Sequence, residues 1–155
     1  MFDNILIGLI IFPRTLTRET FLEFLRDERL LLLEEVSLLT RLRMILQMDG
    51  CPAHYALIVR SFLNENYPRR WIGRQGPVGW PARSPDLTPL EYFLWGTMKQ
   101  RVYSSLINSE VKLKRKSLGV ANEIRNDPEI IRRVTQQIVH RATMCLQQRG
   151  DRLKH

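Results

Sequence analysis

The chain has 155 residues, of which 44% are hydrophobic and 26% charged, a balance that argues against a largely disordered protein. Twenty-four Lys and Arg residues against 16 Asp and Glu residues give a net charge of +8, which favours an anionic partner such as nucleic acid. Two cysteines are too few for a disulfide framework, and the longest apolar run is too short to span a bilayer.

The first third of the chain predicts strands and a helix in alternation. A short run rich in β-branched residues predicts a buried strand over Ile5–Phe12. A helix is expected from its cap at Thr17 to about Val36. A second short apolar run predicts a strand over Met44–Met48, because it is brief and turn residues follow it.

The middle of the chain continues this alternation. A helix is expected over residues 53–66, then a short strand near Trp71 and Ile72, then a loop rich in glycine and proline that reaches Pro85. Thr88, Pro89 and Glu91 are suited to the cap, first and third positions of a helix that extends to about residue 103.

The last third is expected to be helical, over about 109–125 and 128–149. One apolar stripe in the last helix contains Ile131, Val134, Ile138, Ala142 and Cys145. The order of strands and helices predicts an α/β domain. Residues 99–155 hold 13 basic and 5 acidic side chains, whereas residues 1–98 hold 11 of each, so this last segment is the expected surface for a polyanion.

Asp49 and Glu91 are a candidate metal-binding pair. Asp49 follows a predicted buried strand, and sites in open α/β sheets lie at the carboxyl ends of strands. Carboxylates in such places can hold Mg²⁺. Two simpler interpretations stay open: Asp49-Gly50 is a turn, and Glu91 completes a capping box with Thr88. Asp86 competes with Glu91 as a ligand, although it also fits a turn.

Cys51 and His54, with the distant His140 and Cys145, form a second candidate set with the ligand types of a zinc site. Their spacing matches no recognised zinc motif. The simpler interpretation is a small buried cysteine and a loop histidine that hydrogen-bonds locally.

Basic side chains form a third candidate feature, for binding DNA backbone. The candidate contacts are Arg69, Arg70, Arg74 and Arg83, and the run Lys112, Lys114, Arg115 and Lys116. Guanidinium groups bind phosphates, and the nearby Trp71 and Trp80 could stack on bases. We favour the alternative in which these tryptophans are core or loop anchors, and a solvated helix face is the default for the basic run, which also has the composition of a nuclear-import signal.

Two segments resemble motifs of mariner-superfamily transposases. Residues 47–54, Gln-Met-Asp-Gly-Cys-Pro-Ala-His, resemble the motif around the second catalytic acid of the family. Residues 80–96, from Trp80-Pro81-Ala82-Arg83-Ser84-Pro85-Asp86 to Trp95-Gly96, resemble the motif around the third. The segments 62–65 and 70–74 resemble the insect branch, and the similarity extends over about residues 3–104.

This resemblance implies an incomplete ribonuclease-H-like fold, with residues 1–104 as part of a DDE transposase catalytic domain and 105–155 as a basic helical extension. It also implies a two-metal site for Mg²⁺ or Mn²⁺ that cuts DNA at element ends and joins it to a target. Asp49 matches the second acid and Glu91 the third, where close insect relatives usually carry Asp. Asp86 precedes the catalytic position.

The sequence also departs from the family pattern. The first catalytic Asp of the family belongs upstream of the first strand expected here, so Asp3 is not a replacement for it. The helix-turn-helix region is also not matched, and Cys51 and Ala82 replace residues that are usually Ala and Pro. We therefore expect poor DNA cleavage by this chain alone.

The resemblance leaves other interpretations open. We expect a nuclear location, DNA as partner, no membrane, and either a homodimer or pairing with a full-length transposase, because strands without the first strand would expose edges. The alternatives are a non-catalytic DNA-binding or regulatory module and a relic without function.

Overall fold

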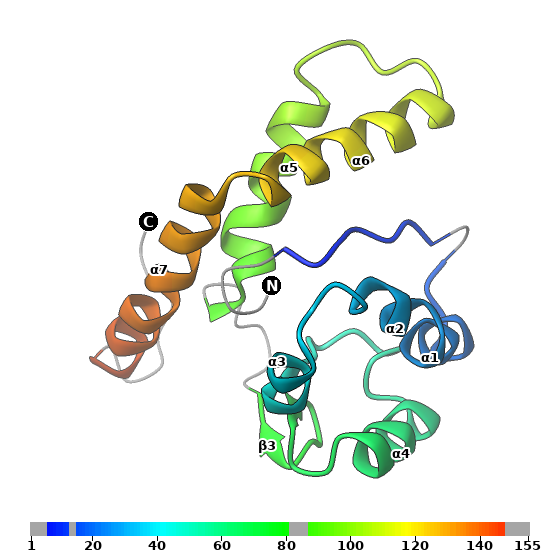
Figure 1. The fold of residues 1–155 in the computed structure, drawn as a ribbon, viewed down its shortest axis with the longest axis vertical. Helices are drawn as coiled ribbons and strands as arrows, with labels where there is room; N and C mark the ends of the chain where they lie inside the picture. Colours follow the sequence, from blue (N-terminus) through cyan, green and yellow to red (C-terminus); the bar gives the residue numbers. More distant parts are fainter. Residues whose placement is uncertain (1–5, 13–14, 81–86, 148–155) are drawn as a thin grey trace. The chain divides into compact units, whose positions relative to one another are not determined.

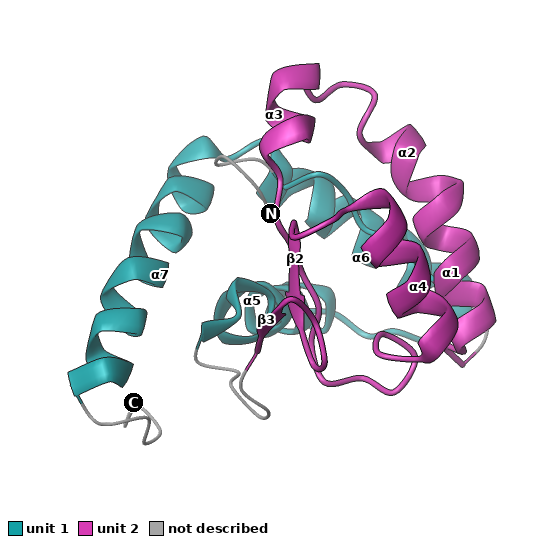
Figure 2. Cartoon of the chain, turned by 90° about the horizontal axis from the view of Figure 1, so that it is seen from below, with its two compact units in different colours: residues 1–11, 84–155 teal, residues 12–83 magenta. Residues whose placement is uncertain are grey.

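The computed structural model describes residues 6–12, 15–80 and 87–147. Its elements divide between two compact units, which Figure 2 colours separately: unit 1 contains residues 1–11 and 84–155, and unit 2 contains residues 12–83. The predicted division into domains at residues 104 and 105 is not tested by this grouping and stays a prediction.

Over its described residues, unit 2 contains four helices and a small parallel sheet (Figure 1). The helices are α1 (Arg18–Arg26), α2 (Glu28–Leu32), α3 (Leu38–Arg43) and α4 (Leu57–Asn66). The strands are β1 (Leu46–Gln47), β2 (Trp71–Gly73) and β3 (Val78–Gly79), hydrogen-bonded in the order β1-β2-β3. Leu46 pairs with Trp71 and Ile72 pairs with Val78 in the parallel register.

Helix α1 begins where the sequence predicts. The Thr17 hydroxyl accepts from the N–H of Thr20 at 3.2 Å, and the Thr20 hydroxyl accepts from the N–H of Thr17 at 3.0 Å, so each satisfies a backbone donor of the other. The prediction of one helix to about Val36 is wrong. The helical path is interrupted at Asp27, with φ −109° and ψ −67°, and α2 ends at Leu32. Val36 lies in the turn region that follows α2 and is buried there. Its side chain therefore contributes to the core although the helix does not reach it.

The core of unit 2 forms where α1, α4 and β2 bring apolar side chains together. Its most buried members are Leu25, Val59, Leu63 and Trp71, none more than 1% exposed. Burying each such side chain contributes about 1.5–3 kcal/mol. The Trp71 indole N–H donates to Asn64 Oδ1 at 3.0 Å, so the one polar atom of the ring is satisfied. Trp71 is thus a core anchor, as we favoured from the sequence.

Other elements of unit 2 differ from the sequence prediction at their bounds. The strand expected over Met44–Met48 is β1, confirmed but shorter, and the helix expected over 53–66 is α4, which begins at Leu57. The strand near Trp71 and Ile72 is confirmed as β2. The sequence missed β3, in the segment predicted as a loop, and α3, which Ser37 caps through its hydroxyl and the N–H of Thr40.

The described residues of unit 1 are mainly helical, whereas residues 6–11 have no regular secondary structure. It contains the π-helix η2 (Leu90–Leu94), α5 (Trp95–Val102), α6 (Glu110–Arg125) and α7 (Pro128–Gln147). These confirm the predicted helices near 88–103 and 109–125, and the last predicted helix as far as 147. The apolar stripe of α7 is buried at Ile131 and Val134 and partly exposed further along. No helix in the described part of the chain is long and apolar enough to cross a membrane.

The predicted strand over Ile5–Phe12 is wrong for its described residues, 6–12, which pair with no strand of the described chain. Leu6 instead belongs to the core of unit 1, and Leu9 packs against the same core. The other buried members of this core are Leu94, Met98, Val102, Val120, Ala121, Ile124 and Ile131. A short apolar run indicates a buried segment but not the kind of element that buries it. Here the segment packs against helices rather than within a sheet.

Candidate functional site

The candidate site begins at the carboxyl end of β1. The Met48 N–H donates to Ile72 O at 2.8 Å, which extends the pairing with β2 by one residue, and Met48 is buried. Asp49 comes next, at the point where the chain leaves the sheet. The structure therefore places Asp49 at the edge of a parallel sheet where polar ligands commonly bind.

A tight loop orients the Asp49 carboxylate. Asp49 Oδ1 accepts from the Cys51 N–H at 2.9 Å and lies 2.5 Å from His54 Nδ1. The backbone N–H of His54 donates in turn to the backbone carbonyl of Cys51 at 2.9 Å. The hydrogen bond from His54 and, less strongly, the one from the Cys51 N–H lower the pKa of Asp49, while partial burial acts in the opposite direction. The carboxylate is therefore held in its charged form.

The His54 ring is fixed by its surroundings. Its centroid lies 4.1 Å from that of Phe21 on α1, with the planes tilted by 37°, and its side chain is 17% exposed. Ala53, its neighbour, is buried. The sequence predicted a local hydrogen bond for His54 as the simpler alternative to zinc, but did not identify Asp49 as its partner. The sequence signal for this contact was that Asp49 and His54 are only five residues apart within one loop.

The Asp49 carboxylate has the chemistry to hold a hard divalent cation. Both contacts described above fall on Oδ1, and the side chain is 48% exposed, so the second oxygen can face a ligand. Oxygen donors of this kind are those that Mg²⁺ and Mn²⁺ prefer. Asp49 fits a metal-binding role on these grounds.

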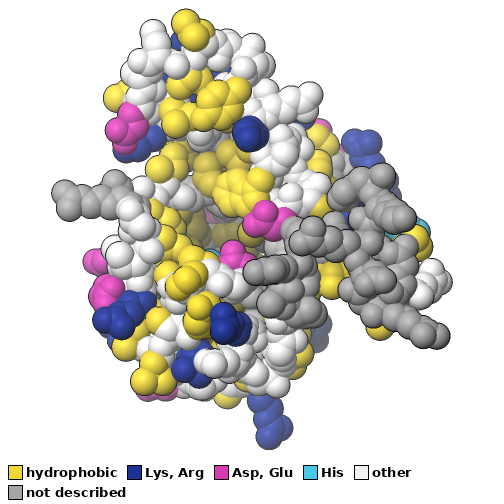
Figure 3. All heavy atoms as spheres, turned by 180° about the vertical axis from the view of Figure 1, so that it is seen from behind, with side chains coloured by type: hydrophobic (Ala, Val, Ile, Leu, Met, Phe, Trp, Pro, Cys, Tyr) yellow, Lys and Arg dark blue, Asp and Glu magenta, His cyan; other side chains and the backbone are white. Residues whose placement is uncertain are grey.

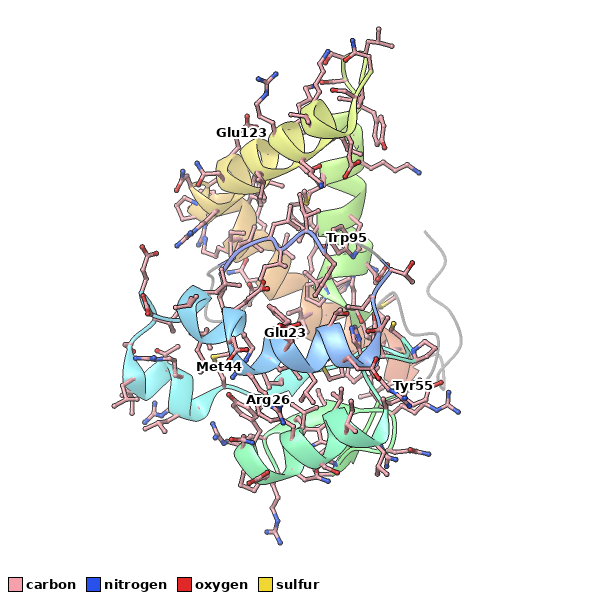
Figure 4. All side chains as sticks on the ribbon, turned by 90° about the vertical axis from the view of Figure 1, so that its right-hand side faces the viewer. Glu23, Arg26, Met44, Tyr55, Trp95 and Glu123 are labelled. Atoms are coloured by element: carbon pink, nitrogen blue, oxygen red, sulfur yellow. The ribbon has the colours of Figure 1, made fainter. Side chains whose placement is uncertain are left out.

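Glu91 lies in the π-helix η2 of unit 1. Its N–H donates to Thr88 O at 2.9 Å, and its side chain is exposed. At the end of this wide turn the Trp95 N–H donates to Leu90 O, five residues back. Figure 4 labels Trp95 at the start of α5. Asp86, the competing ligand, lies outside the described residues.

Asp49 and Glu91 belong to different compact units, unit 2 and unit 1. Their joint role in holding metal stays a prediction.

The arginines near β2 have mixed roles. The Arg70 guanidinium donates to Leu42 O at 2.9 Å and lies 5.2 Å from the Tyr67 ring, so it ties α3 to the end of α4. Arg74 lies over the ring of Tyr55 at 4.5 Å; Figure 4 labels Tyr55. Arg69 is exposed and has a φ of 58°. Arg83 lies outside the described residues.

The basic run on α6 is also partly structural. Lys116 Nζ donates to Val102 O at 3.0 Å and so satisfies a carbonyl at the end of α5. Lys114 is paired with Glu110 at 2.7 Å. Lys112 is half-buried, whereas Arg115 is exposed. Of the four predicted DNA contacts on this helix, Lys114 and Arg115 are exposed, and Lys114 is the one paired with a carboxylate.

An open groove of about 770 Å³ lies along α5 and α6. It is lined by Gln100, Arg101, Ser104, Arg115, Lys116, Gly119, Val120 and Glu123. The Arg101 guanidinium is 3.5 Å from the Glu123 carboxylate, whose residue is labelled in Figure 4. The groove is basic overall, with three cations and one carboxylate, which suits a phosphate backbone better than a neutral ligand.

Comparison with known proteins gives the family. Residues 4–114, well over half of the chain, match the family described as DDE superfamily endonuclease. This chain belongs to that family. The matched segment includes both Asp49 and Glu91. No curated protein sequence matches the chain.

Solved structures give the fold. The chain is similar to the catalytic domain of Mos1 mariner transposase, with a TM-score of 0.74 and 21% identity over 92% of this chain and 66% of that domain. A second structure, of the Mos1 transposase catalytic domain and Raltegravir with Mn, gives a TM-score of 0.72 at 21% identity over 92% of this chain and 68% of that one. The chain therefore spans about two thirds of the length of these domains.

These matches confirm the predicted fold class and family resemblance. The protein has a mixed α/β architecture with a small parallel sheet, related to the ribonuclease-H-like domain of mariner transposases. At 21% identity the similarity to these domains establishes the fold.

Proposed function

We propose that this chain supplies part of a mariner-type transposase catalytic domain, in which Asp49 and Glu91 bind divalent metal. The main support is the position of Asp49. It follows the parallel strand β1 and is oriented by Cys51 and His54, within the segment that matches the DDE endonuclease family. The DNA substrate is proposed from the endonuclease family, and the basic groove along α5 and α6 supports it.

Each residue has a defined task in this proposal. Bound Mg²⁺ or Mn²⁺ would stabilise the attacking and leaving oxygens of a phosphoryl transfer. Asp49 offers its second oxygen, while His54 and the Cys51 N–H hold Oδ1 in place and keep the carboxylate ionised. Glu91 offers an exposed carboxylate at the start of the helical segment that leads into α5. The Mn named with the Mos1 catalytic domain favours this metal class.

The isolated 155-residue polypeptide should cleave DNA poorly. The mariner resemblance assigns a second and a third acid to this chain, and a two-metal site of this family uses three. We therefore expect measurable metal binding with little or no nicking of plasmid DNA. Robust nicking in Mg²⁺ that disappears in Asp49→Asn would overturn this expectation.

The metal assignment is tested by Mn²⁺ binding, followed by electron paramagnetic resonance. We expect Asp49→Asn and Glu91→Gln each to weaken Mn²⁺ binding, because each removes a charged ligand. Glu65→Gln, an exposed carboxylate on α4, is the matched control and should bind Mn²⁺ as the unmodified chain does. Unchanged binding in both acid variants would refute the proposal.

DNA contact is tested with two adjacent residues of α6. Arg115→Gln should reduce DNA affinity and lower the slope of log K against log salt by about 0.9, the value for one phosphate contact. Lys116→Met should chiefly lower stability, because Nζ of Lys116 is bonded to Val102 O within the protein. The opposite pattern, with the salt slope changed only by Lys116→Met, would contradict this assignment.

We further propose a nuclear location and association with a second transposase chain. Support for association comes from exposed apolar side chains on α2, on α3 and immediately before β1: Leu30, Leu31, Leu38, Leu39, Leu42 and Ile45. On the opposite side of the molecule, which Figure 3 draws, apolar side chains (yellow) also reach the surface. Sedimentation over a range of concentrations tests association, and a constant monomer mass would count against it.

A further inference from the structure

The loop after β1 gathers three different metal-binding side chains. A carboxylate oxygen of Asp49, Sγ of Cys51 and a ring nitrogen of His54 all lie within 4.8 Å of one another. The backbone explains this closeness. The Cys51 N–H turns back to Asp49 Oδ1, and the His54 N–H turns back to Cys51 O, so two successive turns bring the side chains to one side.

The cluster is anchored at both ends. Before it, Met48 is bonded to β2 and is 8% exposed. After it, Ala53 is 6% exposed and the His54 ring packs on Phe21 at 4.1 Å. The ligand atoms are therefore held by the packed core of unit 2, so little conformational entropy is lost when an ion binds.

We propose that Asp49, Cys51 and His54 form a site for a thiophilic divalent cation, with Zn²⁺ as the expected occupant and water as the fourth ligand. Thiolate, imidazole and carboxylate are the three ligand types of zinc sites. Mg²⁺ avoids sulfur, so Cys51 distinguishes this site from one for a hard cation.

The present geometry is close to that of a bound site. Metal–oxygen and metal–nitrogen bonds of about 2.0–2.1 Å at a tetrahedral angle place the two ligand atoms about 3.3 Å apart. Asp49 Oδ1 and His54 Nδ1 are now 2.5 Å apart, so a small rotation of either side chain makes room for the ion. On binding, the Cys51 thiol releases its proton to solvent, and the imidazole proton moves to the nitrogen that faces away from the metal.

This site would regulate the proposed enzyme, an inference that rests on the proposed function. Zn²⁺ bound through Cys51 and His54 also uses Asp49, the residue proposed to hold the catalytic metal. Zinc and magnesium would then compete for one carboxylate. Free zinc would keep the metal centre inactive, and a zinc chelator would restore Mn²⁺ binding.

The test is titration of the full chain with Co²⁺, a spectroscopic substitute for Zn²⁺. We expect a thiolate-to-cobalt absorption band that saturates at one equivalent and is removed by Zn²⁺. Cys51→Ala should abolish the band and weaken Zn²⁺ binding by more than about tenfold. Removing a residue that only hydrogen-bonds to a metal ligand already reduces metal affinity by about tenfold or more, and Cys51 is itself a ligand in this proposal. His54→Ala should also weaken binding.

Matched controls separate this site from other zinc ligands. Cys145→Ala and His140→Ala change the same residue types on α7 and should leave the cobalt band intact. Glu91→Gln should weaken Mn²⁺ binding without changing Zn²⁺ binding, so failure of the proposed function can be distinguished from failure of this inference. No cobalt band in the unmodified chain, or a band that survives Cys51→Ala, would overturn the inference. So would loss of the band in Cys145→Ala.

Discussion

Replacing Gly76 by alanine tests how the sheet of unit 2 is packed. An added Cβ would lie 2.7 Å from Cζ3 and 2.9 Å from Cε3 of the Trp71 ring, well inside normal contact distance. The ring cannot move away easily, because Trp71 is fully buried and its N–H is bonded to Asn64. Overpacking of this kind costs about 1–3 kcal/mol. For a chain of this size the melting temperature should fall by about 2–4 °C per kcal/mol.

Gly79→Ala is the matched control. A Cβ at Gly79 meets nothing within 4 Å, so this variant should be neutral, or more stable by about 0.4–1 kcal/mol because the unfolded chain loses freedom. Urea denaturation followed by tryptophan fluorescence compares the two variants. Trp71→Phe provides a further check, because the smaller ring leaves room for the methyl group that Gly76→Ala adds. The double variant should therefore lose less unfolding free energy than the sum of the losses in the two single variants. Equal stability of the Gly76 and Gly79 variants would refute this account of the packing.

Three further predictions concern stability. Tyr92→Phe should cost about 0.5–1.5 kcal/mol at neutral pH, because the hydroxyl donates to Val134 O at 2.9 Å. Burial raises the pKa of Tyr92, so this contribution is full below the ordinary tyrosine value near 10 and is lost as pH rises through the raised value; urea curves at pH 7 and above 10 would show whether the difference shrinks. Ile124→Ala should cost about 2–5 kcal/mol and Ile124→Val about 0.5–1.5 kcal/mol, since this side chain is fully buried, and similar thermal shifts for both would contradict its core position. Thr17→Ala should cost about 0.5–2 kcal/mol through the lost cap of α1, measured by circular dichroism, with Thr15→Ala as control.

The sequence predicted elements whose signals are local. Thr17 and Ser109 are N-caps in the structure. Each side-chain hydroxyl accepts a hydrogen bond from a backbone N–H three residues later, and this interaction depends on the local sequence alone. Asp49 lies where a strand ends, as predicted, although β1 stops at Gln47 and Met48 intervenes. This prediction depended on a short apolar run and a turn, which are both local features.

Features that depend on distant contacts were not predictable from pattern. Strand β3 lies in a glycine-rich segment whose strand character depends on pairing with Ile72 and on the close approach of Gly76 to Trp71. The apolar segment beginning near Leu6 has the pattern of a strand, but its burial is against helices of unit 1. The contact between Asp49 and His54 depends on how the loop between them turns, and the five-residue spacing alone does not determine that path.

The π-helix has a consequence for how this segment tolerates insertion and deletion. Leu94, Met98 and Val102 are buried at intervals of four, and an uninterrupted α-helix would place Leu90 in the same row. Leu90 is instead 37% exposed, because the five-residue turn rotates everything before Leu94 around the helix axis. Deleting one residue between 90 and 94 would therefore leave α5 in its core while turning Glu91 to a different face. A length change of one residue can redirect a carboxylate here while Met98 and Val102 keep their buried positions on α5.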